Sequence, residues 1–275
     1  MKSNNYTILI NSSDGFEDCW NPFFTLLNKY WKNVNNHQIL LNTENKDYSF
    51  GDFNIKCTKA NQGTPNRKLT WSECLIEAIN QIETPLILYF QEDYFIEKPI
   101  KSDLIDEFAE LMINDKSVKY LGLTHFGNRP PFIKWASDYR LKEVSRKSGY
   151  RISTQVALWR KETLLSYVQP EESGWMFEIF GTLRANKRKE LFLAIDPELY
   201  NPKEGCIVEY LHTGIIKGKW HPQIPIIFEK NDIAYIDYNK RGFYKFKSVL
   251  MRKFETSKSI FQNPLLLMRY LFLKK

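Results

Sequence analysis

The chain has 275 residues, of which 43% are hydrophobic and 15% aromatic, and this content supports a sizeable folded core and excludes a disordered chain. Its four cysteines, Cys19, Cys57, Cys74 and Cys206, are scattered without a Cys-x-x-Cys pair. We therefore expect reduced thiols in a cytoplasmic protein, not a disulfide framework or a zinc site.

The net charge of +7 is concentrated near the C-terminus. Residues 240–275 hold ten Lys and Arg and one acid, whereas the rest of the chain holds 29 basic and 31 acidic residues. This distribution excludes a broad basic surface for nucleic acid on the main body. No apolar run reaches the roughly 18 residues of a membrane span. We also expect no signal peptide, because the polar start leads directly into a strand.

The first half of the chain alternates predicted strands and helices, which is typical of a mixed, mostly parallel α/β sheet flanked by helices. Asn21 and Pro22 predict the start of the first helix, as N-cap and first-turn proline. Thr70 and Glu73 have the spacing of a capping box for the second. The expected strands are 6–11, 38–42, 53–58, 85–91 and 118–123, and the expected helices are 22–31, 71–82 and 102–113.

In the second half the patterns are weaker. We expect a loop at 125–131, strands at 150–159, 191–195 and 207–211, and helices at 161–168 and from about 175. No clear linker precedes residue 238, so we predict one domain over 1–238 and a separate tail over 239–275.

The strand that ends at Gln91 is followed by two adjacent acids, Glu92 and Asp93. Burying them without partners is costly, and open α/β sheets bind ligands where strands end. Two acids there suit a divalent cation, Mn²⁺ or Mg²⁺, that holds a nucleotide's phosphates. Since adjacent residues point to opposite faces, we expect Asp93 to reach the metal and Glu92 to lie behind it or contact the sugar. Two solvated acids at a strand end are the alternative.

A second candidate lies in the helix near 175. Trp175 and Glu178 are three residues apart and share a helix face. A carboxylate beside a large aromatic ring is partly desolvated, which raises its pKa and suits it to general-base work. The alternative is a surface glutamate on an amphipathic helix.

A third candidate is the glycine-containing stretch 212–220. Glycines let a backbone approach phosphates closely, and Lys217 and Lys219 could neutralise a diphosphate leaving group. His212 is either a metal ligand or a structural histidine.

Taken in order, these motifs resemble those of GT-A-fold glycosyltransferases of bacterial polysaccharide and lipooligosaccharide assembly, over about residues 6–222. The matching segments are Ile8–Asp14, Trp20–Phe24, Trp71–Glu73, Glu92–Asp93, Gln155–Trp159, Trp175–Glu178 and Gly214–Trp220.

The resemblance implies a GT-A-like, Rossmann-like fold and a hexosyltransferase that uses a nucleotide-sugar donor, above all a UDP-sugar, and a glycan or lipid-linked acceptor. Asp93 takes the last place of the family's Asp-x-Asp metal motif, with Gln91 at the first. The segment from Gly214 to Lys217 resembles a phosphate loop of the family, in which a histidine lies three residues before the glycine, whereas His212 lies two before it. Glu178 matches the base of inverting members.

The residue patterns and the resemblance together give one set of candidates. Ser12 and Asp14 could bind the base or ribose or simply form a solvated turn, and Gln155 and Trp159 could be acceptor contacts or core. The catalytic candidate is Glu178; the donor candidates are Ser12, Asp14, Trp71, Glu92, Asp93, Lys217 and Lys219; the metal candidates are Asp93 and His212; and the acceptor candidates are Gln155, Trp159 and Trp175.

The tail places Phe243, Phe246, Leu250 and Phe254 along one face of a predicted basic helix. Such a helix suits an anionic membrane surface, which would put the enzyme at the inner face of the membrane near a lipid-linked acceptor. A helix packed on the body is the alternative.

Two other functions stay open. A sugar nucleotidyltransferase also uses an α/β sheet and a metal, but such enzymes carry a glycine-rich N-terminal phosphate loop with Arg and Lys, which Asn11–Gly15 lacks. A non-catalytic, membrane-associated binding protein is the other.

Overall fold

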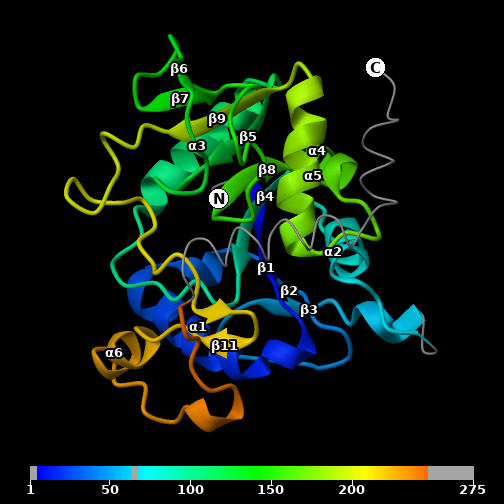
Figure 1. Ribbon diagram of the computed structural model, residues 1–275, viewed down its shortest axis with the longest axis vertical. Helices are drawn as coiled ribbons and strands as arrows, with labels where there is room; N and C mark the ends of the chain where they lie inside the picture. The colour runs from blue at the N-terminus through cyan, green and yellow to red at the C-terminus, as the bar shows by residue number, and fades with distance from the viewer. Residues whose placement is uncertain (1–4, 64–66, 247–275) are drawn as a thin grey trace.

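The computed structural model describes residues 5–63 and 67–246 (Figure 1). Within them the main sheet has nine strands in the order β3-β2-β1-β4-β8-β5-β9-β7-β6. Only β8 and β7 run against the others, so the expected mixed, mostly parallel sheet is confirmed. The strands are β1 Tyr6–Asn11, β2 Ile39–Leu41, β3 Ile55–Cys57, β4 Leu86–Gln91, β5 Val118–Gly122, β6 Phe132–Lys134, β7 Leu141–Val144, β8 Ala157–Arg160 and β9 Leu191–Ile195, and β10 Ile215–Ile216 pairs with β11 Lys219–Trp220 in a separate hairpin.

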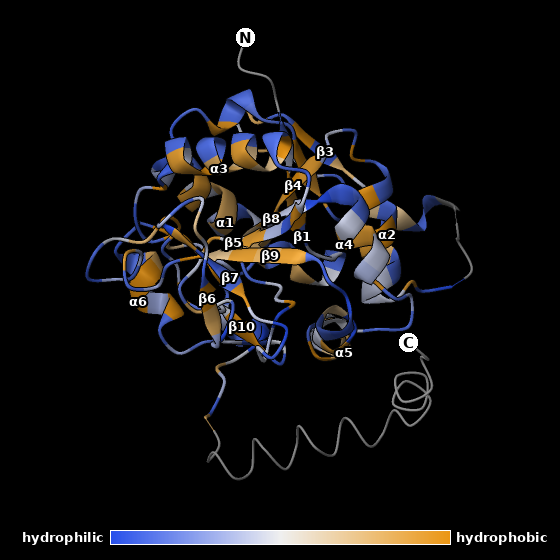
Figure 2. Cartoon of the chain, turned by 90° about the horizontal axis from the view of Figure 1, so that it is seen from above, coloured by the Kyte–Doolittle hydropathy of each residue, from blue (hydrophilic) through white to orange (hydrophobic). Residues whose placement is uncertain are grey.

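Helices cover both faces of the sheet (Figures 1 and 2). Successive strand residues point to opposite faces, and in β1 Ile8 and Ile10 join one buried cluster while Leu9 joins the other. The first cluster contains α1 Glu17–Tyr30, α3 Ser102–Asn114 and α6 Ile224–Glu229, and the second contains α2 Trp71–Asn80, α4 Lys161–Tyr167 and α5 Gly174–Lys187. Four 3₁₀ turns are η1 Asp14–Phe16, η2 Val34–Asn36, η3 Ala60–Gly63 and η4 Tyr238–Lys240.

The first residues of α1 and α2 test the predictions that were made from local capping signals. The capping box of α2 is present, with Glu73 N donating to Thr70 Oγ1 at 3.1 Å and Thr70 N donating to Glu73 Oε2 at 2.8 Å. The predicted start of α1 at Asn21 was wrong, because the helix begins at Glu17 and includes Pro22. Burial of the turn before the proline, with Cys19 completely inaccessible, favours the longer helix.

Three other expectations differ from the structure. The predicted strand over 150–159 begins only at Ala157, since backbone groups before it bond to side chains of α5 instead. Residues 207–211 form one isolated bridge, between Ile96 and Tyr210, in place of a strand. The β6–β7 pair was not predicted.

The predicted tail helix was wrong over 241–246, where Phe243 forms a parallel bridge with Trp220 in an irregular segment. The rest of that helix, including Leu250 and Phe254, lies outside the described residues.

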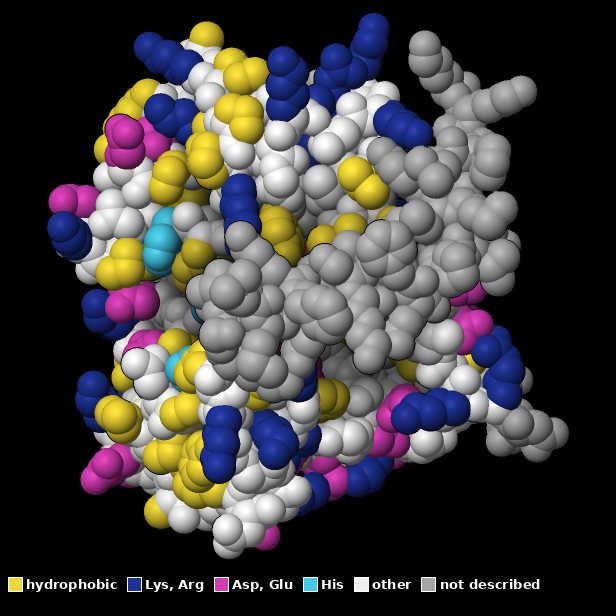
Figure 3. Space-filling view, viewed as in Figure 1, with side chains coloured by type: hydrophobic (Ala, Val, Ile, Leu, Met, Phe, Trp, Pro, Cys, Tyr) yellow, Lys and Arg dark blue, Asp and Glu magenta, His cyan; other side chains and the backbone are white. Residues whose placement is uncertain are grey.

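The described surface agrees with the charge analysis. On the face drawn in Figure 3, Lys and Arg side chains are spread among hydrophobic and acidic ones instead of forming one continuous basic patch. No helix within residues 5–63 and 67–246 has the length and apolar character needed to cross a bilayer.

Candidate functional site

The carboxyl ends of β1, β2 and β4 lie side by side because these strands are parallel neighbours. Close to this edge runs a chain of hydrogen-bonded polar side chains, of which Asn42, Thr58 and Tyr89 were not singled out by the sequence analysis. Asn42 Nδ2 donates to Asn11 Oδ1 at 2.9 Å, and Asn11 Nδ2 donates to the Tyr89 hydroxyl at 3.1 Å. Thr58 and Gln91 extend the chain at its two ends. The amide and hydroxyl side chains at or just after the ends of these strands are the sequence signal from which this chain could have been predicted.

Asp93 holds the β10–β11 hairpin. Its Oδ2 accepts hydrogen bonds from Thr213 Oγ1 at 2.6 Å, Ile215 N at 2.9 Å and Gly214 N at 3.1 Å. Burial raises the pKa of Asp93, and these three donors act in the opposite direction by favouring the ionised form. The acidic strand end and the lysine-bearing turn therefore meet.

Gly214 makes this close approach possible. A Cβ at this position would lie 2.4 Å from a ring carbon of Phe95 and 2.7 Å from the Asp93 carbonyl oxygen, which no ordinary contact allows. Beyond it, Lys217 and Gly218 both have positive φ, +51° and +76°, and form the two-residue turn of the hairpin. Lys217 and Lys219 are exposed at this turn.

Glu178 lies in α5 with its carboxylate against the loop before β8. Its Oε1 accepts hydrogen bonds from Thr154 N at 2.8 Å and Thr154 Oγ1 at 2.9 Å, and Ser153 Oγ lies 3.5 Å away. Burial raises the pKa of Glu178, although these donors and the positive charge of Arg129 oppose the shift. A raised pKa is the property that the sequence analysis expected of a general base.

Two tyrosines connect the strand end with the loop that holds Glu178. Tyr94, next to Asp93, donates to the Thr154 carbonyl at 3.0 Å, and Thr154 N in turn binds Glu178. Tyr210 stacks on Tyr94 at 4.6 Å and donates to Gln155 Oε1 at 2.8 Å. The structure thus brings Asp93, the hairpin, Gln155 and Glu178 into one hydrogen-bonded neighbourhood.

Other candidates have structural partners. Ser12 Oγ accepts from Trp20 Nε1 at 2.7 Å. Asp14 accepts from the backbone N–H groups of Glu44 and Asn45 at 2.9 and 3.0 Å, so it ties the first turn to the loop after β2.

The three tryptophans among the candidates lie in two places, at the start of α5 and in the core. Trp71 packs against Gly174 and Phe177 at the start of α5, and Trp175 is half-buried in the first turn of that helix. Trp159 is 1% exposed in the core, so of the two possibilities left open for it, the structure supports core and not acceptor contact.

The donor set for a metal is small. Among the described residues, no three His, Cys, Asp or Glu side chains are grouped to hold a metal ion. Asp93 Oδ1, however, is buried without a hydrogen-bond partner. One such oxygen fits a cation that takes its other ligands from phosphates and water, as Mg²⁺ does, and does not fit a cage of protein groups. The His212 ring lies on Phe126, with ring centroids 5.1 Å apart.

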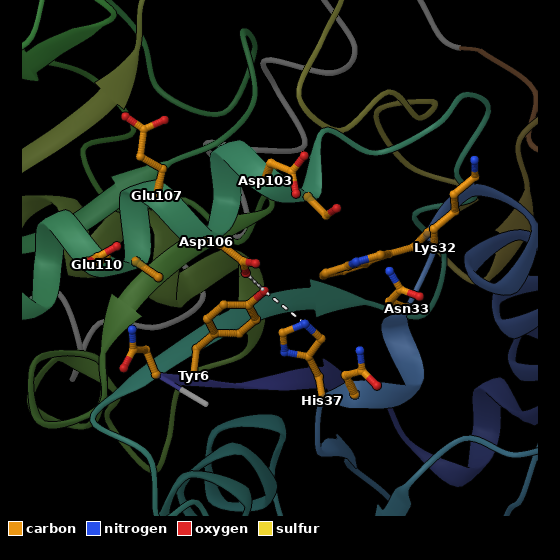
Figure 4. A pocket seen from close by; sticks show the side chains of 13 residues that line it. Tyr6, Lys32, Asn33, His37, Asp103, Asp106, Glu107 and Glu110 are labelled. Atoms are coloured by element: carbon orange, nitrogen blue, oxygen red, sulfur yellow. Dashed lines mark hydrogen bonds between the residues drawn. The ribbon is translucent and has the colours of Figure 1, made fainter. Parts of the chain in front are cut away.

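A cavity of about 910 Å³ lies away from this site (Figure 4). Tyr6 and His37 line it together with acidic residues of α3, and the Tyr6 hydroxyl donates to Asp106 Oδ1 at 2.8 Å. Because Tyr6 is the first residue of β1 and Asn11 the last, the cavity lies at the amino edge of the sheet. None of the predicted site residues lines it.

No protein-family model matches the chain, and no curated protein matches it. Among solved structures, S. aureus TarS 1–349 matches at 11% identity and TM-score 0.43, over 69% of this chain and 57% of its own length. The chain thus spans less than two thirds of that relative.

Two other matches were solved with nucleotides. Glucosyl-3-phosphoglycerate synthase from Mycobacterium tuberculosis, with Mn²⁺ and UDP-glucose, matches at 7% identity and TM-score 0.37, over 66% of this chain and 64% of its own. CMP:2-keto-3-deoxy-manno-octonic acid synthetase, with CTP, matches at 13% identity and TM-score 0.39, over 69% of this chain and 88% of its own length. At such TM-scores these matches assign no activity to this chain.

Proposed function

We propose that the chain is a glycosyltransferase that moves a sugar from a nucleoside-diphosphate donor, a UDP-sugar above all, to a hydroxyl of a glycan or lipid-linked acceptor. One observation carries the proposal. Asp93 binds the hairpin that presents Lys217 and Lys219, while its neighbour Tyr94 binds the carbonyl of Thr154, whose N–H binds the carboxylate of Glu178. A cation-bearing turn and a carboxylate of raised pKa are the two groups that displacement of a diphosphate needs.

The reaction in this proposal is a single displacement. Glu178 takes the proton from the acceptor hydroxyl, and the oxygen forms a bond to the anomeric carbon as the bond from that carbon to the diphosphate oxygen breaks. The configuration inverts. Lys217 and Lys219 neutralise the charge on the departing diphosphate, and Gln155 and Trp175 contact the acceptor. A positioned base contributes about 10²- to 10⁴-fold to such a step.

A divalent cation, Mn²⁺ or Mg²⁺, would be held through Asp93 Oδ1, with His212 as the proposed second protein ligand. It would supply positive charge to the diphosphate when bound. Ser12, Asp14, Trp71 and Glu92 complete the proposed donor site, the first three by fixing the loops and the helix around it.

The test measures UDP release from a panel of UDP-sugars without acceptor, in the presence and absence of Mn²⁺. Glu178→Gln should lower the rate at least 100-fold and leave the Kd for UDP within twofold of the wild type, because the amide keeps the shape and loses the base. Glu171→Gln, an exposed acid just before α5, is the control and should behave as wild type.

Unchanged turnover in Glu178→Gln would exclude the base role. Loss of UDP binding by a folded Glu178→Gln protein would also count against it. Release of pyrophosphate from CTP or UTP with a sugar phosphate, in place of UDP release, would favour a nucleotidyltransferase.

A further inference from the structure

The segment 238–244, here called the strap, pairs with the β10–β11 hairpin although it follows the hairpin in sequence only after α6 (orange in Figure 1). Trp220 N donates to the Gly242 carbonyl at 3.0 Å, and Tyr244 N donates to the Trp220 carbonyl at 2.9 Å. Gly242 has a φ of +62°, and its N–H binds the Tyr238 carbonyl at 2.8 Å, which closes the turn before this pairing. The strap therefore runs beside β11 as a third segment.

Arg241, in the middle of the strap, reaches the first turn after β1. Its Nε donates to Asp18 Oδ2 at 2.7 Å, its Nη2 donates to the other Asp18 oxygen, and Nη2 also donates to the Gly15 carbonyl at 2.6 Å. The guanidinium lies over the Phe16 ring at 4.7 Å and 5.9 Å from the Trp220 ring centre. The Arg241 side chain is only 10% exposed, so one largely covered cation joins the strap beside the hairpin to the first turn.

The same cation faces the acidic strand end. Glu92 and Asp93 are 7% and 5% exposed, and no ion pair of Glu92 occurs in the part of the chain that the structure describes. Burial and the neighbouring Asp93 raise the pKa of Glu92, and Arg241 is the positive charge that opposes this shift. Asp18 therefore binds the Arg241 cation directly, and the charge of Arg241 also acts on the neighbouring Glu92.

We propose that Arg241 is a positioning residue of the donor site, and that the strap belongs to the nucleotide-sugar-binding domain. Arg241 fixes the distance between the first turn, which borders the proposed donor site, and the hairpin, which carries the proposed contacts to the diphosphate. This inference rests on the proposed function. It also moves the domain boundary: the sequence suggested a tail from 239, whereas the contacts of 238–244 are with the body.

The test compares full-length Arg241→Gln and Arg241→Lys with Lys240→Gln, an exposed neighbour, as the control. Arg241→Gln should raise the KM for the UDP-sugar at least tenfold and leave the kcat of UDP release within twofold. Arg241→Lys should recover part of this loss, because it keeps the charge without the two-point contact. Lys240→Gln should match wild type.

A second readout does not depend on the proposed function. Hydrogen exchange of the hairpin 213–220 and of the turn 12–18 should accelerate at least tenfold in Arg241→Gln, and Asp18→Asn should add little to it because the two residues act as a pair. Unchanged exchange in both segments would overturn the inference even if the wild type binds no UDP. Faster exchange with an unchanged KM would overturn the link to the donor site alone.

Discussion

A methyl group at position 214 should displace the β10–β11 hairpin. In Gly214→Ala the new Cβ would meet a Phe95 ring carbon at 2.4 Å, whereas carbon atoms in ordinary contact are about 3.5–4.0 Å apart. The ring cannot move away, because Phe95 is fully buried against Trp220 and Phe228. The backbone of residue 214 must therefore shift by about 1 Å to reach normal contact.

That shift acts on the hydrogen bonds of Asp93. The bonds from Gly214 N and Ile215 N are 3.1 and 2.9 Å long, and an added ångström takes both beyond hydrogen-bonding range. Overpacking of this kind costs about 1–3 kcal/mol, which for a domain of this size lowers Tm by roughly 2–4 °C per kcal/mol. If donor binding has to restore the native position of the hairpin, the same energy weakens the Kd for UDP by about 5- to 150-fold.

The assay is thermal unfolding together with calorimetric titration of UDP, with and without Mn²⁺. Gly149→Ala is the matched control, since a Cβ there meets nothing within 4 Å. Wild-type Tm and wild-type UDP affinity in Gly214→Ala would refute the argument that this glycine is required by the close approach of the hairpin to Asp93.

Three further predictions concern stability, pH and the tail. Glu172→Ala should cost roughly 3–5 kcal/mol in urea unfolding, because it removes a buried carboxylate and leaves the Arg184 side chain, which is only 12% exposed, without its ion-pair partner. Asp47→Ala, which removes an exposed carboxylate from its pair with Lys59, should cost less than about 1 kcal/mol. Equal losses in the two variants would contradict this prediction. Arg129→Gln removes a positive charge that lowers the pKa of Glu178, so the pKa of Glu178 should rise. The acidic limb of the pH profile of kcat/KM for UDP release should therefore move to higher pH. If this limb does not move, Arg129 does not influence the ionisation of Glu178 during UDP release. Anionic liposomes should float the full chain and not a chain ending at 246 if the basic tail binds membranes, and equal flotation would end that proposal.

Local features of the sequence determined most of the elements. A capping box acts within four residues, so Thr70 and Glu73 set the start of α2 correctly. A short apolar run identifies a buried strand from local sequence, so Tyr6–Asn11 and Leu86–Gln91 are where they were expected. The positions of Asp93 and the glycine–lysine turn after predicted strands also marked them as candidates, because open α/β sheets bind ligands at the carboxyl ends of their strands.

The roles of single side chains depended on partners distant in sequence. Asp14 carries the same carboxylate as a ribose ligand would, yet the loop after β2 supplies N–H groups for it. Trp159 lies on β8, where both faces of the sheet are covered by helices, so its place on a strand could not distinguish a ligand contact from a core position.

What the sequence alone determined was therefore most strands and helices of the first half of the chain and the types of the candidate side chains, since each follows from contacts over a few residues. The tertiary structure alone decided which of them meet. Asp93 binds Thr213, 120 positions away, and Arg241 binds Asp18, 223 positions away. Such pairs form only after the sheet has brought the strand ends together, and no local pattern records which distant loop will supply a donor to a buried carboxylate.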